Sequence, residues 1–375
     1  MRVFLYARRR RRHSSGTDRG AGNKFWSAAR EWDNRLARKS SFISGRERGL
    51  SKPIVLVTAA TVSDLAQDLL RAGGADIAFM PDRVDEDALV AALAGQNVAA
   101  VLLRGSPPFT AKVFAAARDL KIIAKHGAGV DSVDIASASR HGVAVMVAGG
   151  ANADAVAEHA LAMMLSLSRE LPRFDRDTRQ GAWRDLNHFV RDFRVRSVGI
   201  VGYGQIGERT ARLAQACGAQ VVIHTRSAIA LPAGMAFEPD LNRLLERVDI
   251  VSLHCPLTEA TRGMMGAAQF ARMKPGALLI NTARGPVVDE PALVDALKSG
   301  HLAGAGLDTF AVEPPDPANP LFALPNVLVT PHIAAATTDA MVRMGTIAAN
   351  NIISYLRGEV YDPRNFLNPE VFRGA

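Results

Sequence analysis

Cysteine is scarce in this chain, since only Cys217 and Cys255 occur among its 375 residues. The two lie far apart and show neither CxxC nor Cys/His ligand spacing, which argues against a disulfide framework and against a zinc site. Long apolar runs are also missing, because no stretch approaches the roughly 18 consecutive apolar residues of a membrane helix. We therefore expect no bound metal and no membrane association, and we predict a protein of the reducing cytoplasm.

Excess positive charge is confined to the start of the chain, although the whole sequence has a net charge of +8. Residues 1–52 contain 15 Lys and Arg against 4 Asp and Glu, which leaves the rest with 30 against 33, a net of −3. Segment 1–52 includes the run Arg8–Arg12 and little apolar periodicity, which predicts a disordered basic extension. For the body we regard a nucleic-acid partner as improbable.

Three interpretations of segment 1–52 stay open. It could be an arm for nucleic acid or an anionic surface, an organelle-targeting peptide, or an idle extension, for instance from an upstream start codon. We favour the idle extension, because an apolar strand begins cleanly at Ile54 without it.

Short apolar runs alternate with helical stretches from Pro53 onward, which is typical of parallel βαβ units. The first series of predicted strands is Ile54–Thr58, Ile77–Met80, Ala99–Leu103, Ile122–Lys125 and Ala144–Val147. The second series is Ser197–Val201, Gln220–His224, Ile250–Leu253, Ala277–Ile280, Ala303–Leu307 and Val327–Val329. Between them we predict one helical segment over about 152–171, begun by Asn152 and ended by Pro172.

A glycine fingerprint lies near residue 202, so roughly 150 residues of separate α/β structure precede it. A Rossmann domain normally begins with its fingerprint strand, and the earlier series therefore predicts a second domain. We predict an α/β fold of two Rossmann-like domains with parallel sheets and an active site in the cleft between them. The dinucleotide-binding domain is expected over 154–334. The substrate-binding domain is expected over 53–153 and 335–375, because the closing helix, about Asp339–Leu356, should cross back to it.

The fingerprint itself is Gly202-Tyr203-Gly204-Gln205-Ile206-Gly207, directly after a strand and before a helical stretch. Gly202 permits the tight turn, Gly204 lets the backbone approach a pyrophosphate, and Gly207 lets the helix pack on the strand. The helix N-terminus then offers N–H groups to the phosphates. A lone GxGxxG is a weak signal, but this context predicts a bound dinucleotide.

No carboxylate stands at the end of the next strand, where one would bind the ribose 2′-hydroxyl of NAD. The residues there are His224, Thr225, Arg226 and Ser227. Arg226 could pair with the 2′-phosphate of NADP while the two hydroxyls donate to it, so we favour NADP over NAD. The alternative is that Arg226 stacks on adenine or points into solvent.

Polar residues follow four later strands, and in an open parallel sheet ligands bind beyond the carboxyl ends of the strands. They include Arg284, Asp308, Glu313 and His332. An Arg can bind a substrate carboxylate as a bidentate fork, a His can donate a proton near neutral pH, and a carboxylate beside that His favours its protonated form. This set suits hydride transfer to a 2-oxo acid. Taken one at a time, each of these residues has an alternative interpretation. Arg284 could be a surface ion-pair partner, Glu313 could be a loop residue, and His332 could be a structural histidine.

Residues 53–360 resemble the D-isomer-specific 2-hydroxyacid dehydrogenase family, in the manner of its glyoxylate/hydroxypyruvate reductases or phosphoglycerate dehydrogenases. The segments that carry the resemblance are Gly202–Gly207, Asn281–Glu290, Gly306–Pro314 and Thr330–Ala334, with support from His126–Asp131 and Asn152–His159. The resemblance implies that Arg284 binds and polarises the substrate, and that His332 is the acid/base with Glu313 as its partner. It further implies substrate contacts at Arg104, Ala128 and Gly129. The cofactor contacts expected are Gly202, Gly204, Gln205, Ile206, Gly207, Thr225, Arg226, Ser227, Cys255, Pro256, Thr282, Ala283 and Asp308.

The sequence departs from the family pattern in three places. Residues 190–196 lack the usual Glu-Leu and Gly-Lys pairs, Ala334 replaces a frequent Gly, and Thr225 replaces the usual Asp. Only the last bears on chemistry, through the choice of cofactor. We expect a homodimeric enzyme that reduces a small 2-oxo acid, such as glyoxylate or hydroxypyruvate, with NADPH. The alternative is a dinucleotide-sensing, corepressor-like binding protein on the same fold, with segment 1–52 as its nucleic-acid arm.

Overall fold

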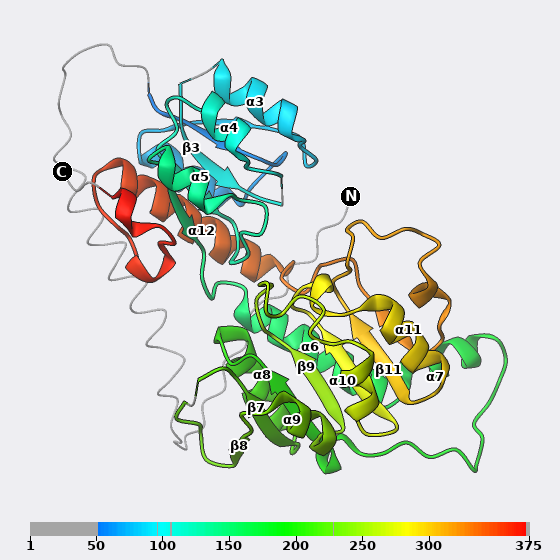
Figure 1. Ribbon diagram of the computed structural model, residues 1–375. Coiled ribbons are helices and arrows are strands. Elements are labelled where there is room, and N and C mark those ends of the chain that lie inside the picture. The colour runs from blue at the N-terminus through cyan, green and yellow to red at the C-terminus, as the bar shows by residue number, and fades with distance from the viewer. Residues whose placement is uncertain (1–51, 96, 106, 228, 373–375) are drawn as a thin grey trace, which may run out of the picture. The chain divides into compact units, whose positions relative to one another are not determined.

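The computed structural model describes residues 52–95, 97–105, 107–227 and 229–372 (Figure 1). Apart from Lys52, the predicted basic extension lies outside these residues. Within the described ranges, no helix is both long and apolar enough to cross a bilayer.

The first sheet is built from the first series of predicted strands. Its members are β1 (Ile54–Val57), β2 (Asp76–Phe79), β3 (Val98–Leu103), β4 (Ile122–Lys125) and β5 (Ala144–Val147). They pair in the order β2-β1-β3-β4-β5, and every pairing is parallel. Every residue of β3, β4 and β5 is buried, as expected of near-continuous apolar runs in a parallel sheet with both faces covered.

Helices cover both faces of this sheet. One face packs on α2 (Asp64–Ala72) and α12 (Thr338–Leu356), the other on α3 (Glu86–Ala94), α4 (Ala111–Ala116) and α5 (Ile135–Arg140). Figure 1 shows α12, drawn in orange-red, beside the blue and cyan elements from the start of the described chain. Helix α12 thus packs on the first sheet. The domain boundaries that we placed at 153/154 and 334/335 remain predictions.

The second sheet contains seven parallel strands in the order β12-β11-β10-β9-β6-β7-β8. They are β6 (Ser197–Val201), β7 (Gln220–His224), β8 (Met235–Phe237), β9 (Ile250–Leu253), β10 (Ala277–Asn281), β11 (Leu302–Leu307) and β12 (Val327–Val329). The chain runs outward from β6 in one direction to β8 and in the other to β12. The carboxyl ends of β6 and β9 therefore flank the switch point where such sheets bind their ligands.

Two groups of helices cover the second sheet. On one face lie α6 (Ala153–Ser168) and α8 (Gln205–Ala216), and on the other α9 (Leu241–Arg247), α10 (Ala267–Arg272) and α11 (Glu290–Lys298). Short 3₁₀ turns complete the described chain at Phe193–Val195, Gly285–Val287, Pro320–Ala323, Pro363–Asn365 and Pro369–Val371.

The helix predicted over about 152–171 is present as α6, but the role predicted for Pro172 is wrong, because a second helix follows the first. The first, α6, ends at Ser168, and Glu170 then adopts a left-handed backbone conformation with φ of 51°. A second helix, α7 (Leu171–Arg179), begins there with Pro172 in its first turn. Proline has no N–H to leave unpaired at a helix start and its φ is preset for the helix, so Pro172 begins a helix where we expected it to end one. Asn152 takes the N-cap position of α6 but its side chain makes no capping hydrogen bond.

Candidate active site

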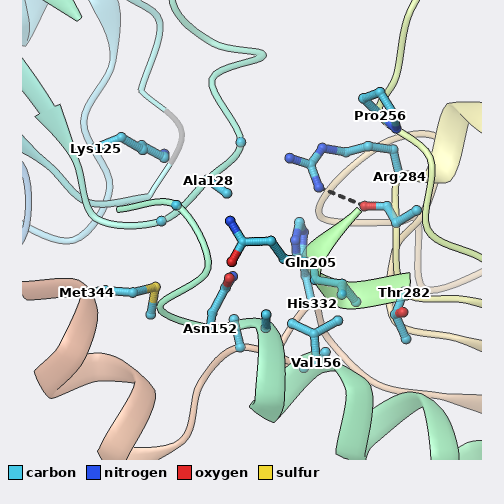
Figure 2. A pocket seen from close by; sticks show the side chains of 18 of the residues that line it. Lys125, Ala128, Asn152, Val156, Gln205, Pro256, Thr282, Arg284, His332 and Met344 are labelled. Atoms are coloured by element: carbon cyan, nitrogen blue, oxygen red, sulfur yellow. Dashed lines mark hydrogen bonds between the residues drawn. The ribbon is translucent and has the colours of Figure 1, made fainter. Parts of the chain in front are cut away.

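One pocket of about 850 Å³ is lined by residues that follow strands of both sheets. Most of the predicted site residues line it, namely Arg104, Ala128, Gly129, Gly204, Gln205, Ile206, Cys255, Pro256, Thr282, Ala283, Arg284, Asp308 and His332. Figure 2 shows Lys125 and Ala128 on one side of this space, Pro256 and Arg284 on the other, and Gln205 and Asn152 between them. Side chains far apart in sequence therefore converge on a single cavity.

Six predicted site residues do not line the pocket. Gly202 and Gly207 are part of the turn that shapes it, and Glu313 reaches it through His332. Thr225, Arg226 and Ser227 follow β7, the neighbour of β6, and Arg226 and Ser227 are exposed. Within the described chain, Arg226 has no ion-pair partner.

The three glycines of the fingerprint differ in what surrounds them. A Cβ on Gly207 would collide with the carbonyl oxygen of Gly202, and one on Gly202, whose φ is 95°, would lie 2.7 Å from the backbone of Cys255. A Cβ on Gly204 would meet nothing within 4 Å. The protein itself thus requires glycine at the outer positions, whereas the open space over Gly204, at the N-cap of α8, suits a ligand approaching the backbone.

Three residues that line the pocket have a buried polar atom without a hydrogen-bond partner in the described chain. The atoms are Oδ1 of Asn152, Nδ1 of His254 and Oγ1 of Thr282. Burial lowers the pKa of His254 to about 3, so its ring is neutral, and its Nε2 lies 2.9 Å from Oγ of Ser252. Because buried polar groups are almost always paired, these atoms fit a bound molecule such as a dinucleotide.

Glu313 and His332 form an ion pair at the pocket, with Nδ1 of His332 2.7 Å from Oε2 of Glu313. The hydrogen bond to Glu313 raises the pKa of His332, and the charge of Glu313 adds to that effect against the opposing effect of burial. Burial raises the pKa of Glu313, but its bonds from His332 and from the N–H of Phe310 hold that pKa below its usual value. Because Nδ1 of His332 is bonded to Glu313, its other ring nitrogen, Nε2, is the one that can contact a ligand.

A buried carboxylate holds the backbone around His332. Asp308, 1% exposed, accepts from the N–H groups of Ile333 and Ala334 at 2.9 Å each and from the hydroxyl of Thr330 at 2.6 Å. His332 itself has φ of 53°, a conformation that a non-glycine residue keeps only where its surroundings enforce it. The sequence assigned Asp308 to the cofactor, and the structure adds that it fixes the segment carrying His332.

Arg284 follows β10 and is held from several sides. Its Nη1 donates to the carbonyl oxygen of Ala283 at 2.7 Å, the bond dashed in Figure 2, and its Nε donates to Oδ2 of Asp131 at 2.7 Å. Its Nη2 lies so close to Gly129 that a Cβ there would collide with it, so only glycine leaves room for the guanidinium.

Sequence reasoning missed Lys125 and His126, which end β4 and begin the loop beyond it, and both line the pocket. Burial and the charge of Arg284 lower the pKa of Lys125 to about 8, while its Nζ donates to the carbonyl oxygen of Gly105. Burial lowers the pKa of His126 to about 4. The rule that polar residues follow pocket-forming strands would have found them, had it been applied to the first sheet.

Replacing Glu313 with glutamine is expected to lower the pKa of His332, because the charge and the strongest hydrogen bond that stabilise the imidazolium are lost. A smaller fraction of His332 is then protonated at neutral pH. NMR titration of the imidazole resonances, assigned with a His332→Asn variant, measures both pKa values. An unchanged or higher pKa in Glu313→Gln would contradict the pairing.

Comparisons with known proteins place these features in a family. Residues 161–334 match the sequence model of the "D-isomer specific 2-hydroxyacid dehydrogenase, NAD binding domain". The chain is 40% identical to a glyoxylate reductase of Korarchaeum cryptofilum over 273 residues, 71% of this chain and 81% of the relative. The chain belongs to the D-isomer specific 2-hydroxyacid dehydrogenase family. This confirms the resemblance described above.

Two further comparisons bear on fold and length. A D-3-phosphoglycerate dehydrogenase of Archaeoglobus fulgidus is 35% identical over 306 residues, 81% of this chain but 57% of the relative, so the chain spans little more than half of that protein. An NADPH-dependent glyoxylate/hydroxypyruvate reductase of Sinorhizobium meliloti, solved with NADP and malonate, superposes with a TM-score of 0.74 at 29% identity, covering 87% of this chain and 99% of that one. The predicted fold of two Rossmann-like domains is confirmed by the two parallel sheets and by such neighbours in the D-isomer specific 2-hydroxyacid dehydrogenase family.

Metal ligation has no support in the part of the chain that the structure describes. There, no cluster of three or more His, Cys, Asp or Glu side chains is placed to hold an ion. Cys217 and Cys255 are both free, and burial raises the pKa of Cys255.

Proposed function

We propose that this protein transfers a hydride between a nicotinamide cofactor and a small 2-oxo or 2-hydroxy acid of D configuration, such as glyoxylate or hydroxypyruvate. The observation that carries the proposal is that Arg284 and the Glu313–His332 pair share one pocket with an N-capping Gly204 whose open space suits a phosphate. The matched NAD-binding domain supports a nicotinamide cofactor.

Substrate binding is assigned to Arg284. A guanidinium offers parallel N–H groups that match a carboxylate, and it stays charged at every relevant pH. Its positive charge also stabilises the negative charge that gathers on the neighbouring carbonyl oxygen during reduction. On the other wall, the backbone around Ala128 and Gly129 would complete the substrate contacts.

Proton transfer is assigned to Nε2 of His332. Reduction of a 2-oxo acid creates an alkoxide, which needs a donor whose pKa lies near the working pH. The carboxylate of Glu313 keeps His332 protonated at higher pH than a free histidine and fixes its ring through Nδ1. In the direction of oxidation the neutral ring takes the proton back.

The cofactor, when bound, supplies or accepts the hydride. We assign its diphosphate to the N-terminal turn of α8, including Gly204, Gln205 and Ile206. The unpartnered Oγ1 of Thr282 and Nδ1 of His254 would bond to it, and Cys255, Pro256, Ala283 and Asp308 line the same side of the pocket. Both buried atoms gain a hydrogen bond that the described chain does not offer them.

NADP is favoured over NAD because cationic and hydroxyl groups, and no carboxylate, follow β7. Glu238, a buried acid just after β8, is already bonded at both oxygens, by Arg247 at 3.0 Å and by the N–H of Asp240 at 3.3 Å. Replacing Arg226 with alanine is expected to lower kcat/KM for NADPH about 10- to 100-fold, since one charged hydrogen bond to phosphate is lost, and to leave NADH within about twofold. Equal losses with both cofactors would contradict a 2′-phosphate contact at Arg226.

The substrate side of the pocket favours a small polar acid. Arg104 and Lys125 line it in addition to Arg284, and no ion pair involves either of the two in the described chain. The informative measurement is NADPH oxidation at about 340 nm with glyoxylate, hydroxypyruvate, its phosphate ester and pyruvate. Turnover of at least one supports the proposal. Tight cofactor binding without turnover of any 2-oxo acid would favour the corepressor-like alternative.

We propose a homodimer on the basis of an exposed apolar segment. The stretch from α7 to β6 exposes Leu171, Trp183, Leu186, Phe189 and Val195, with Trp183 and Phe189 at 84% and 83%. In Figure 1 it extends from α7 as an open loop. Large apolar side chains gathered on a surface are typical of protein interfaces.

A cytoplasmic location remains a prediction from the scarcity of cysteine.

A further inference from the structure

The pocket contains a carboxylate bound to Arg284 that belongs to the protein itself. Asp131 lies in the loop after β4, Arg284 follows β10, and both line the pocket. Nε of Arg284 donates to Oδ2 of Asp131 at 2.7 Å, and the side chains of Arg284 and Asp131 are 30% and 47% exposed, respectively. The contact thus joins a segment of the first sheet to a segment of the second.

The substrate of the proposed reaction presents the same chemical group to the same arginine. The guanidinium already has protein neighbours at each nitrogen, with Asp131 at Nε, the carbonyl of Ala283 at Nη1 and the backbone of Gly129 at Nη2. Of these, only Asp131 carries a charge. An incoming carboxylate therefore meets a neutralised arginine and an acidic neighbour that repels it.

Asp131 also differs from the other acidic residue of the pocket. Asp308 is buried and accepts three hydrogen bonds from Thr330, Ile333 and Ala334, so it is fixed in place. Asp131 is half exposed, and in the described part of the chain its side chain forms an ion pair with Arg284 alone. A solvent-exposed carboxylate can leave its partner for water at little cost, which makes Asp131 displaceable.

We propose that Asp131 competes with the substrate carboxylate for Arg284 and thereby sets the affinity of the site for 2-oxo acids. The inference rests on the proposed role of Arg284 as the substrate-binding residue. Asp131 acts through Arg284 and is an affinity-setting residue without a part in the chemical step. When the substrate binds, Arg284 exchanges its ion pair with Asp131 for one with the substrate carboxylate. The substrate therefore binds more weakly than it would to an arginine without an ion-pair partner.

The test replaces Asp131 with asparagine, which keeps the shape and removes the charge. The probe is oxamate, an unreactive 2-oxo acid analogue, titrated by calorimetry into protein saturated with cofactor, alongside KM and kcat for the reduced acid. We expect Asp131→Asn to lower the Kd of oxamate and the KM about two- to fivefold, the range for an exposed ion pair, with kcat little changed. Higher ionic strength should shrink the difference.

The chain offers a matched control in Asp154, whose Oδ1 accepts from Nε of Arg209 at 2.5 Å with exposures of 58% and 34%. Neither residue lines the pocket, so Asp154→Asn should leave both constants unchanged. Weaker oxamate binding with a lower kcat in Asp131→Asn would overturn the proposal by showing that Asp131 orients Arg284. Values equal to those of Asp154→Asn would overturn it as well.

A third variant distinguishes an error in the proposed role of Asp131 from an error in the proposed function of the site. Arg284→Ala should lose oxamate binding if Arg284 holds the carboxylate. If Arg284→Ala loses oxamate binding while Asp131→Asn binds oxamate as the wild type does, only the proposed competition is contradicted. If Arg284→Ala binds oxamate normally, the proposed function of the site is contradicted too.

Discussion

Replacing Arg284 with alanine is expected to lower kcat/KM for the 2-oxo acid about 10²- to 10⁴-fold. The variant loses two charge-assisted hydrogen bonds to the carboxylate, each worth about 1.5–3 kcal/mol, and every 1.4 kcal/mol is about tenfold. It also loses the cation beside the developing alkoxide, so kcat should fall together with the affinity. Steady-state kinetics at saturating cofactor measure both parameters.

Arg284→Lys is the matched control for this experiment. A lysine restores the charge but not the planar fork, so we expect kcat/KM between those of the wild type and Arg284→Ala. Cofactor affinity, measured separately, should stay near that of the wild type in both variants, because no dinucleotide contact is assigned to this side chain. Near-normal kcat/KM in Arg284→Ala would remove Arg284 from the mechanism.

Replacing His332 with asparagine is expected to lower kcat about 10²- to 10⁴-fold, the usual contribution of a positioned general acid. Asparagine suits this position because it tolerates the left-handed backbone that His332 adopts at φ of 53°. The bonds from Ile333 and Ala334 to Asp308 should therefore survive, and the fold with them. Kinetics over a range of pH measure the loss of the acid group.

The pH profile distinguishes a lost acid from a disturbed site. In the wild type, the rate of reduction should fall as the pH rises through the elevated pKa of His332, because the imidazolium is the proton donor. In His332→Asn that limb should disappear, with the KM for the cofactor unchanged. A variant that keeps both the limb and the kcat would assign proton transfer to another group.

Most strands of the second sheet and its phosphate-binding turn could be predicted, because both follow from local sequence pattern, whereas the order of the strands was not predicted. Alternating apolar runs and helices predict parallel βαβ units, and the spacing of Gly202, Gly204 and Gly207 between a strand and a helix identifies the turn. The edge strand β8 (Met235–Phe237) was missed, whereas β12, which is equally short, was predicted; β12 has two β-branched valines, which favour a strand, and β8 has none. The role of Pro172 was predicted wrongly because proline occurs both in the first turn of helices and just after their ends. The left-handed backbone of Glu170, which separates the two helices, cannot be predicted from the sequence.

Within the candidate site, the sequence by itself determined which side chains follow strands, and hence that Arg284, Asp308, Glu313 and His332 would gather at one edge of a sheet. It also established the family, through motifs that the comparisons match. Only the tertiary structure decided what faces these residues from the other sheet. The ion pair between Asp131 and Arg284 joins residues 153 positions apart, and the lowered pKa of Lys125 depends on burial and on that same arginine. Strand pattern is a local property of the chain, whereas burial and charge pairing arise from residues brought together only when both sheets have formed.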